Sequence, residues 1–358
     1  RDIFDLQMGK TPSRDNNMYW KDGNLPWVSI SDLSKSQIYI ENSKELITKF
    51  AVKDTLVKCI PKDTVIMSFK LSLGKTAITR KPLYTNEAIM AFIDKKVIQI
   101  EPKYIYFLFS YIQWGQFTNN AVKGKTLNKK FFSDFQINIP KYTQQTKVSS
   151  ILIRINKILE YKRSLIEIYD ALIKSRFDEL FLNTHSIETM EIGELFEVGS
   201  SKRILQSELT TYGIPFYRVT DLINRINDRP VDIKQYVDEL KYMTLIKEKY
   251  VPQAGDFLIT ARGTIGKIYE VKQNDKFYFQ DGMITWLKRK NNYINNLFFM
   301  ELVKTDWFRR QFYSSNNGTT ISYLSITDTR HLKVLLPALN LQLQFAQEVY
   351  QINKLKFD

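Results

Sequence analysis

A chain of 358 residues is long enough for two domains, and its 44% hydrophobic and 25% charged content is typical of a folded protein and excludes a disordered one. One cysteine and two histidines exclude a disulfide framework and a zinc cluster. The 52 Lys and Arg exceed the 38 Asp and Glu and give a formal net charge of +14, which favours a polyanionic partner; a merely lysine-rich surface is the alternative.

A short sequence near the N-terminus is repeated in the second half of the chain. PWVSISDL occupies residues 26–33, and PFYRVTDL occupies residues 215–222. Four further pairs follow in the same order, and the distance between partners rises from 189 to 197 residues, as loop insertions would make it do. The chain is therefore two diverged copies of one unit. The further pairs are residues 60–78 with 251–269, 84–93 with 278–287, 124–128 with 318–322, and 137–143 with 334–340.

Each copy is expected to be a mixed, β-rich α+β unit. Short stretches alternate apolar and polar residues, which predicts strands, and turns such as Asp22-Gly23 separate them. An aromatic helical stretch follows in each copy and ends near Trp114 and near Trp307. Cys59 lies among apolar residues and is expected in the core.

A long helix is expected between the copies, because residues 142–191 contain no Pro or Gly. Pro140 and Pro337 are each followed three residues later by a good helix N-cap, Thr143 and Asn340. Apolar residues at three-four spacing predict a stripe that packs on a partner helix, and an ordinary core helix is the alternative. The stripe consists of Val148, Ile151, Ile155, Ile158, Leu165, Tyr169, Leu172 and Leu180 in the central helix and of Phe345, Val349 and Ile352 in the second helix.

No pattern typical of catalysis or nucleotide binding is present in the sequence. The Gly-Lys-Thr at residues 74–76 lacks the glycine that a phosphate loop needs five residues earlier, where Phe69 stands. The Gly-Lys-Thr at residues 124–126 lacks it too, and Gly266-Lys267 is followed by Ile268. We therefore assign no catalytic residue and no metal ligand to this chain.

The sequence also carries no sign of a membrane segment. The longest apolar run, Tyr104 to Ile112, is too short to span a bilayer, and no signal-peptide pattern is present. A cytoplasmic protein without a membrane partner is expected.

Residues 6–33 resemble the start of a target recognition domain in the specificity subunits of type I restriction-modification systems. Gly-Lys-Thr-Pro-Ser at residues 9–13 is followed by Tyr-Trp, Pro-Trp and Asp-Leu pairs in the order typical of that family. The duplication, GTIGK at residues 263–267 and IPKYTQQTKVSSIL at the start of the long helix extend the resemblance over essentially the whole chain. The second copy lacks the Thr-Pro-Ser run.

The resemblance implies an α+β fold of two repeated, mixed α/β, β-rich target recognition domains. Long helices would join and separate them and form an antiparallel coiled coil, and the whole would be pseudo-twofold symmetric. The expected parts are target recognition domain 1 at residues 1–140, the central spacer helix at 141–182, target recognition domain 2 at 183–337 and a C-terminal spacer helix at 338–358.

The resemblance also implies a function. The chain would be a non-catalytic subunit that binds double-stranded DNA, reads one half of a bipartite sequence with each domain, and directs two methyltransferase subunits and restriction/translocase subunits to it. It would bind no cofactor itself, since S-adenosylmethionine, ATP and Mg are expected on the partner subunits. A basic RNA-binding scaffold and a two-domain enzyme with an unrecognised active site are the alternatives.

Basic and polar residues in loops are the candidates for DNA contact, because Lys and Arg bind phosphates and Arg and amide side chains read base edges. In the first copy they are Lys10, Thr11, Ser13, Arg14, Lys70, Ser72, Lys75, Lys123 and Lys125. In the second copy they are Lys202, Arg203, Arg218, Arg262, Thr264, Lys267, Asn317, Thr319 and Tyr323.

Overall fold

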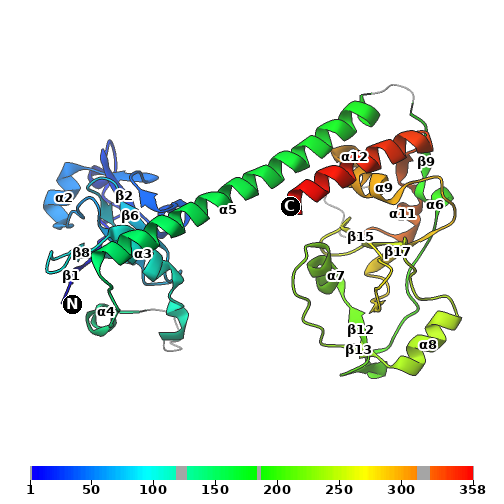
Figure 1. Ribbon diagram of the computed structural model, residues 1–358, viewed down its shortest axis with the longest axis horizontal. Coiled ribbons are helices and arrows are strands. Elements are labelled where there is room, and N and C mark those ends of the chain that lie inside the picture. The colour runs from blue at the N-terminus through cyan, green and yellow to red at the C-terminus, as the bar shows by residue number, and fades with distance from the viewer. Residues whose placement is uncertain (1, 118–126, 184–186, 313–322, 358) are drawn as a thin grey trace. The chain divides into compact units, whose positions relative to one another are not determined.

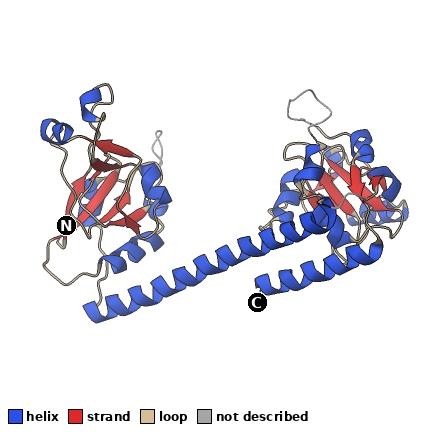
Figure 2. Ribbon diagram, turned by 90° about the horizontal axis from the view of Figure 1, so that it is seen from above, coloured by secondary structure: helices blue, strands red, loops and turns tan. Residues whose placement is uncertain are grey.

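The computed structural model describes residues 2–117, 127–183, 187–312 and 323–357. The chain divides into two compact units, Arg1–Tyr161 and Lys162–Asp358, and the long helix α5 (Tyr142–Phe177) contributes residues to both (Figure 1). In each unit the strands gather into sheets with helices packed around them (Figure 2). This mixed content and the single long helix confirm the expected α+β fold class. The four-part division of the chain stays a prediction.

Unit 1 is built on a five-stranded sheet with the order β1-β8-β5-β6-β3, which is antiparallel except where β3 pairs with β6. A smaller sheet has the order β4-β2-β7. Helix α3 covers the larger sheet with Ile105 and Phe109, which join Val65 and Phe92 in one core. Before α5, the elements of this unit are β1 (Phe4–Met8), η1 (Asn17–Tyr19), β2 (Leu25–Val28), α1 (Ile30–Lys35), β3 (Tyr39–Ile40), β4 (Glu45–Ile47), α2 (Lys49–Thr55), β5 (Val65–Ser68), β6 (Thr76–Thr79), β7 (Tyr84–Thr85), β8 (Ile89–Asp94), α3 (Pro102–Tyr111), η2 (Trp114–Phe117) and α4 (Lys129–Asp134).

Unit 2 repeats this arrangement. Its sheet β10-β17-β14-β15 pairs in the same antiparallel sense as β1-β8-β5-β6, and β12 pairs with β13 and β16 as β2 pairs with β4 and β7. After α5, its elements are η3 (Asp178–Leu182), β9 (Thr189–Glu191), α6 (Ile192–Leu195), β10 (Phe196–Gly199), η4 (Gln206–Glu208), β11 (Leu209–Thr210), β12 (Ile214–Tyr217), α7 (Val219–Ile226), β13 (Tyr236–Val237), α8 (Glu239–Lys247), β14 (Phe257–Thr260), β15 (Ile268–Glu270), β16 (Tyr278–Phe279), β17 (Ile284–Arg289), α9 (Asn296–Leu302), α10 (Asp306–Arg310), α11 (Ile326–His331), β18 (Lys333–Leu335) and α12 (Leu339–Phe357).

The repeated octapeptide is a strand that turns directly into a capped helix. In unit 1, β2 ends before Ser29, whose side chain accepts a hydrogen bond from the backbone N–H of Asp32, while the Asp32 carboxylate accepts from the backbone N–H of Ser29. In unit 2, the Asp221 carboxylate accepts in the same way from the backbone N–H of Arg218, at 2.9 Å. Because the aspartate satisfies an amide that the first helical turn leaves unpaired, the Asp-Leu pair occurs in both copies.

A buried glutamine ties each long helix to its own unit. Gln145 is 1% exposed; its Oε1 accepts from the backbone N–H of Glu101 at 2.9 Å, and its Nε2 donates to the carbonyls of Gln99 and Pro140 at 3.1 and 2.9 Å. In unit 2 the side chain of Gln342 is 0% exposed and makes the equivalent three bonds, with Asn295, Tyr293 and Pro337. Each amide therefore ties the first turn of its helix to the segment between a strand and a shorter helix of the same unit. That segment is residues 99–101, between β8 and α3, in unit 1 and residues 293–295, between β17 and α9, in unit 2.

The helix starts differ slightly from the expectation. Helix α5 begins at Tyr142 and α12 at Leu339, one residue before Thr143 and Asn340, so these two residues are not the N-caps and that prediction was wrong. The carbonyls of Lys141 and Ala338 accept the first helical bonds, from residues 144, 145, 341 and 342. The buried glutamines do not cap the helices either, since they bond Glu101, Gln99 and Pro140 in unit 1 and Asn295, Tyr293 and Pro337 in unit 2.

Within unit 2, the end of α5 and α12 form an antiparallel pair. Arg176 binds Glu348 at 2.9 Å and Asp170 binds Lys356 at 2.6 Å, so the contacts move backward along α5 as they move forward along α12. The rings of Phe177 and Phe345 lie 5.4 Å apart. The hydrogen bond and charge of Glu348 raise the pKa of Arg176, and the hydrogen bond from Arg176 lowers the pKa of Glu348.

The stripe residues fall into two groups. Phe345 and Val349 are buried, and Leu180 and Ile352 are partly buried against the same core, which also holds Ile173, Phe177 and Phe181. Tyr169 is half-buried, whereas the other members of the stripe are exposed, and their packing stays a prediction. The exposed members are Val148, Ile151, Ile155, Ile158, Leu165 and Leu172.

Cys59 is exposed, so the expectation that it lies in the core was wrong. It follows α2 in a loop whose carbonyls at Lys58 and Cys59 accept from the side chain of Gln7. Its apolar neighbours Val57 and Ile60 are buried in its place.

Replacing Gln145 with Ala should lower the free energy of unfolding by about 1–3 kcal/mol, because it removes a buried side chain and leaves one partly buried N–H and two carbonyls without their partner. Gln342→Ala should have an effect of similar size. Urea unfolding measures both, and the exposed neighbour Gln144→Ala is the matched control. Equal, small effects for all three variants would contradict a structural role for the buried amides.

Candidate nucleic-acid interface

In unit 1, three loops come together at one end of the larger sheet. The backbone N–H of Lys10 donates to the carbonyl of Thr85 at 2.9 Å, and that of Phe69 donates to the carbonyl of Ala88 at 2.9 Å. The N–H of Asn86 donates to the carbonyl of Val28 at 3.1 Å. These bonds join residues 9–14, 69–75 and 86–88, which we call the unit 1 loop cluster.

Unit 2 places the equivalent loops together. The N–H of Ala261 donates to the carbonyl of Met283 at 2.8 Å, and that of Gln280 donates to the carbonyl of Tyr217 at 3.0 Å. The hydroxyl of Ser200 donates to the carbonyl of Ile284 at 3.2 Å. We call residues 200–203, 218, 261–267 and 280–283 the unit 2 loop cluster.

The loop after β5 has the same internal structure as the loop after β14. The N–H of Gly74 donates to the carbonyl of Ser68, and that of Gly266 to the carbonyl of Thr260, both at 2.9 Å. Gly74 and Gly266 have φ values of +80° and +75°, and a Cβ at either would overlap an aromatic ring, Trp114 or Phe312 respectively. Glycine is therefore required at this place of both copies.

The residues predicted in the first loop of unit 1 are held by their own unit. Lys10 Nζ donates to the carbonyl of Thr55 at 2.7 Å, and the Lys10 carbonyl accepts from Trp27 Nε1 at 3.0 Å. The carbonyl of Ser13 accepts from Trp20 Nε1 at 3.0 Å. The indole groups thus fix the backbone of this loop, so that its side chains are presented from a rigid segment.

Arg14 lies between an acid and two aromatic rings. It makes a two-point contact with Glu45, and its guanidinium carbon lies 4.1 Å from the ring centre of Trp20 and 4.9 Å from that of Trp27. The hydrogen bond that Arg14 donates to Glu45 raises the pKa of Arg14. This cation is oriented before any ligand arrives, although Glu45 already satisfies part of its charge.

The residues predicted in the second loop of unit 1 are more open. Ser72 and Lys75 are exposed, and the Ser72 carbonyl accepts from the Ser68 hydroxyl. The Lys75 N–H donates to the Ser68 hydroxyl at 3.0 Å. Lys70 is half-buried with its ammonium 5.4 Å from the ring centre of Phe69. The two lysines of this loop are therefore available to a polyanion on a loop of fixed shape.

In unit 2, the predicted residues that precede β14 differ in how they are held. Lys202 forms an ion pair with Glu248 at 2.7 Å, and that bond raises the pKa of Lys202. Arg218 donates to the side-chain oxygen of Gln235 at 2.5 Å. Arg203 is exposed.

The loop after β14 carries the remaining described candidates. The guanidinium carbon of Arg262 lies 4.4 Å from the ring centre of Tyr323, and the two residues form a short backbone bridge. Thr264 and Lys267 are exposed, and the Lys267 N–H donates to the Thr260 hydroxyl at 3.0 Å. Arg262 is thus exposed, and its guanidinium makes a cation–π contact with the ring of Tyr323.

Four predicted residues, Lys123, Lys125, Asn317 and Thr319, lie outside the described residues. The backbone on the far side of each gap returns to the loop clusters, since Leu127 N–H donates to the Phe69 carbonyl and Leu324 N–H to the Ala261 carbonyl.

The sequence analysis missed several residues of the clusters. Trp20 and Trp27 position the first loop, Gln235 holds Arg218, and Glu87 accepts a hydrogen bond from the Thr11 hydroxyl. The repeat could have identified Glu87, because an acid, Asp281, stands in the aligned stretch of the second copy. A search for basic residues alone passes over both acids.

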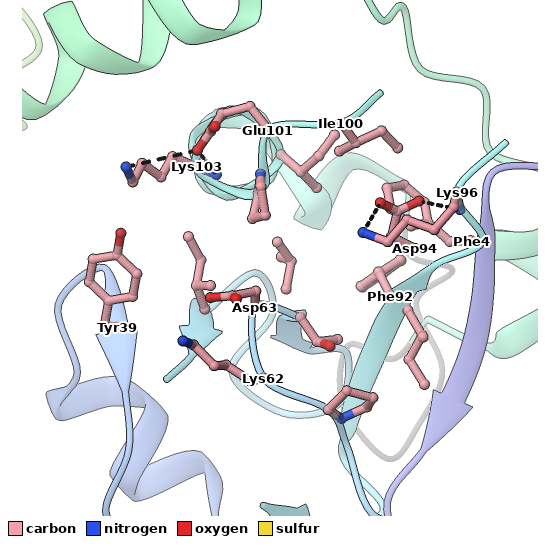
Figure 3. A pocket seen from close by; sticks show the side chains of 17 residues that line it. Phe4, Tyr39, Lys62, Asp63, Phe92, Asp94, Lys96, Ile100, Glu101 and Lys103 are labelled. Carbon is pink, nitrogen blue, oxygen red and sulfur yellow. Dashed lines mark hydrogen bonds and ion pairs between the residues drawn. The ribbon is translucent and has the colours of Figure 1, made fainter. Parts of the chain in front are cut away.

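A cavity of about 650 Å³ lies at the opposite end of the unit 1 sheet (Figure 3). Its lining includes apolar side chains, such as Phe4 and Phe92, and lysine and acidic side chains, among which Asp94 binds Lys96. In unit 2, Arg289 stands at the place of Asp94 and donates to the carbonyl of Ile294 at 2.8 Å. The cavity is a feature of unit 1 and contains none of the predicted DNA-contact residues, so it lies outside the candidate interface.

Neither a metal site nor a membrane segment is found in the part of the chain that the structure describes. Its histidine, cysteine, aspartate and glutamate side chains form no cluster of three that could hold a metal ion. None of its helices is both long enough and apolar enough to cross a bilayer.

Comparison with known proteins gives one family. The sequence model of the type I restriction modification DNA specificity domain matches residues 1–168 and 185–355. The type I restriction enzyme MjaIX specificity subunit of Methanocaldococcus jannaschii is 25% identical over 368 residues, which cover 94% of this chain and 82% of that protein.

Solved structures show the same fold. The S subunit of a type I restriction-modification system from M. genitalium superposes with a TM-score of 0.55 at 16% identity, covering 99% of this chain and 88% of that chain. A chain from a structure that concerns complex assembly and conformational transition of the type I restriction-modification system gives a TM-score of 0.60 at 13% identity, covering 99% and 89%.

The chain therefore belongs to the family of type I restriction-modification DNA specificity domains, and its two units contain the two copies of that domain. Specificity subunits are the non-catalytic members of these systems. Membership thus gives this chain the role of recognising a DNA sequence.

Gly266→Ala should destabilise unit 2 more than Gly263→Ala does, although both residues have positive φ values, +75° and +71°. At Gly263 a Cβ meets open space, so the cost is backbone strain of about 1 kcal/mol. At Gly266 the overlap with Phe312 should add about 1–3 kcal/mol. Urea unfolding of the two variants is the measurement, and equal costs would mean that the aromatic ring does not define the loop.

Proposed function

We propose that this chain reads a bipartite sequence in double-stranded DNA, with one half-site for each unit, and directs partner methyltransferase and restriction subunits to it. The observation that carries the proposal is the duplicated loop cluster, in which basic side chains stand on loops of the same internal structure. Two copies of one reading surface on one chain suit two half-sites separated by unread base pairs.

The chemistry of the clusters supports duplex DNA as the ligand. Lys70, Lys75 and Lys267 supply charge for phosphates, while Arg262 and Arg218 offer guanidinium groups that can read guanine. Nonspecific attraction follows from the net charge of +14.

The aromatic residues of the clusters argue against single-stranded RNA. Proteins that read unpaired bases stack them on open aromatic faces. Among the described residues of the clusters and those that pack on them, Trp27 is 2% exposed, Trp20 lies under Arg14, Tyr323 lies under Arg262, and the more exposed Tyr250 lies under Lys202. These rings thus face cations of the clusters, a use that favours DNA over the RNA scaffold.

The partners follow from the family. We propose two methyltransferase subunits and restriction/translocase subunits, which would supply all catalysis. The cofactors S-adenosylmethionine, ATP and Mg would then bind those subunits and not this chain.

Selection from randomised duplex DNA tests the proposal, with the chain co-purified with the methyltransferase encoded beside its gene. A bipartite motif with a fixed gap is the expected result. Deleting residues 155–161 of α5 should shorten the gap by about 3 base pairs, because seven residues span about 10 Å of helix and one base pair about 3.4 Å. Binding that fades with salt and yields no motif would contradict sequence recognition.

Two substitutions separate base contacts from phosphate contacts. Arg262→Ala should weaken binding by about 1–3 kcal/mol and relax the preference at one position of one half-site. Lys75→Ala should weaken binding to all sequences and lower the slope of log K against log salt by about one. Lys62→Ala, at the opposite end of the unit 1 sheet, is the control and should change neither. A uniform loss for Arg262→Ala would assign it to a phosphate instead.

A further inference from the structure

Glu87 is an acid at the centre of a basic loop cluster. It follows Asn86 in the connection between β7 and β8, is exposed, and lies near enough to Lys70 and Arg14 for their charges to lower its pKa. Unit 2 has Asp281 directly after Gln280, whose backbone N–H bonds Tyr217 as that of Asn86 bonds Val28. The unit 2 loop is one residue longer before β17, since Met283 there takes the place of Ala88. Both loops thus carry a carboxylate on the residue that follows this shared bond.

The surroundings of Glu87 keep it ionised and leave it an open acceptor. Partial burial alone would raise the pKa of Glu87, but the hydrogen bond from Thr11, its own backbone N–H and the cations Lys70 and Arg14 outweigh burial and lower it. The side chain is therefore a carboxylate at neutral pH. Thr11 donates to Oε2, and because a carboxylate has four acceptor positions, the group can still receive further hydrogen bonds.

The chemistry of duplex DNA leaves few partners for such a group. A carboxylate accepts hydrogen bonds and donates none, so a phosphate oxygen repels it. In the major groove the amino group of cytosine has an acceptor on one side only, O6 of the paired guanine, whereas the amino group of adenine lies between two acceptors, its own N7 and O4 of the paired thymine. An ionised carboxylate therefore fits cytosine better than any other base.

We propose that Glu87 determines specificity by accepting a hydrogen bond from the N4 amino group of a cytosine in the half-site that unit 1 reads. This inference rests on the proposed function. The surrounding cations make the contact possible, because Arg14 and Lys70 offset the repulsion between the carboxylate and the flanking phosphates. Thr11 fixes the orientation of the carboxylate, so that the contact costs little ordering of the side chain.

A purely structural role for Glu87 would predict something different. If the acid only held Thr11 and the neighbouring cations in place, its removal would weaken contacts that are independent of sequence. Binding to all sequences would then fall together. Base preference at a single position is the readout that separates the two roles.

The test is selection from randomised duplex DNA with the complex of this chain and its methyltransferase, for the wild type, Glu87→Gln and Glu87→Ala. Glu87→Gln keeps an oxygen that can accept from Thr11 but adds two donors, and a glutamine amide pairs with adenine. We expect Glu87→Gln to change one column of one half-site from cytosine toward adenine, with about a tenfold loss of discrimination for cytosine. Glu87→Ala should lose the cytosine preference and gain no other.

Glu41→Gln is the matched control. It makes the same chemical change at an exposed glutamate that follows β3, at the end of the sheet away from the loop cluster, and should leave every column unchanged. Thermal unfolding of each variant verifies that unit 1 remains folded.

The outcomes are distinct. If the wild type gives a motif and no single column changes in the two Glu87 variants, the inference is overturned while the proposed function stands. A uniform loss of affinity with all preferences kept overturns it as well and assigns Glu87 a structural role. A wild-type complex that selects no motif at all would overturn the proposed function and this inference together.

Discussion

The buried amides of Gln145 and Gln342 are the constraint on which the rest of the structure depends. Each is enclosed by its unit, and each satisfies one backbone N–H and two carbonyls at the point where a strand-to-helix connection meets the start of a long helix. A buried amide with all its partners is directional, whereas the apolar contacts around it are not. The start of α5 in unit 1 and of α12 in unit 2 is therefore fixed by hydrogen bonds. Equivalent junctions therefore carry helices of different length, 36 residues for α5 in unit 1 and 19 residues for α12 in unit 2.

The repeat made much of this architecture predictable. Two copies of an eight-residue sequence identified the strand, the turn and the Asp-Leu pair, and the capping boxes at Asp32 and Asp221 supply the physical reason for the resemblance. Gly74 and Gly266 were visible as a shared Gly-Lys pair, and both occupy backbone conformations that glycine adopts without strain. The long helix was predictable because no residue in its span breaks a helix, and the family could be inferred from the order of motifs that are individually weak.

Other features were beyond the sequence because they depend on which distant side chains meet. Thr143 and Asn340 are good caps by residue type, yet the buried glutamines two residues further on make the contacts that matter. The three-four spacing identified Phe345 and Val349, but Ile173, Phe177 and Phe181 complete that core through neighbours that periodicity does not reveal. The candidate interface shows the same limit. Arg14 and Lys202 were chosen for their charge, and only the folded chain shows that Glu45 and Glu248 already bind them.

The backbone of the two β-hairpin loops differs in one respect. Leu71 has a φ of +62° in unit 1, at the place where unit 2 has Gly263 with +71°. Glycine adopts a positive φ without strain, whereas a leucine in this conformation costs about 1–3 kcal/mol of local backbone energy. The contacts around the unit 1 loop must hold Leu71 in a conformation that leucine disfavours, whereas Gly263 needs no such support. Two loops of the same internal structure therefore depend to different degrees on the residues that surround them, and the unit 1 loop depends on them more.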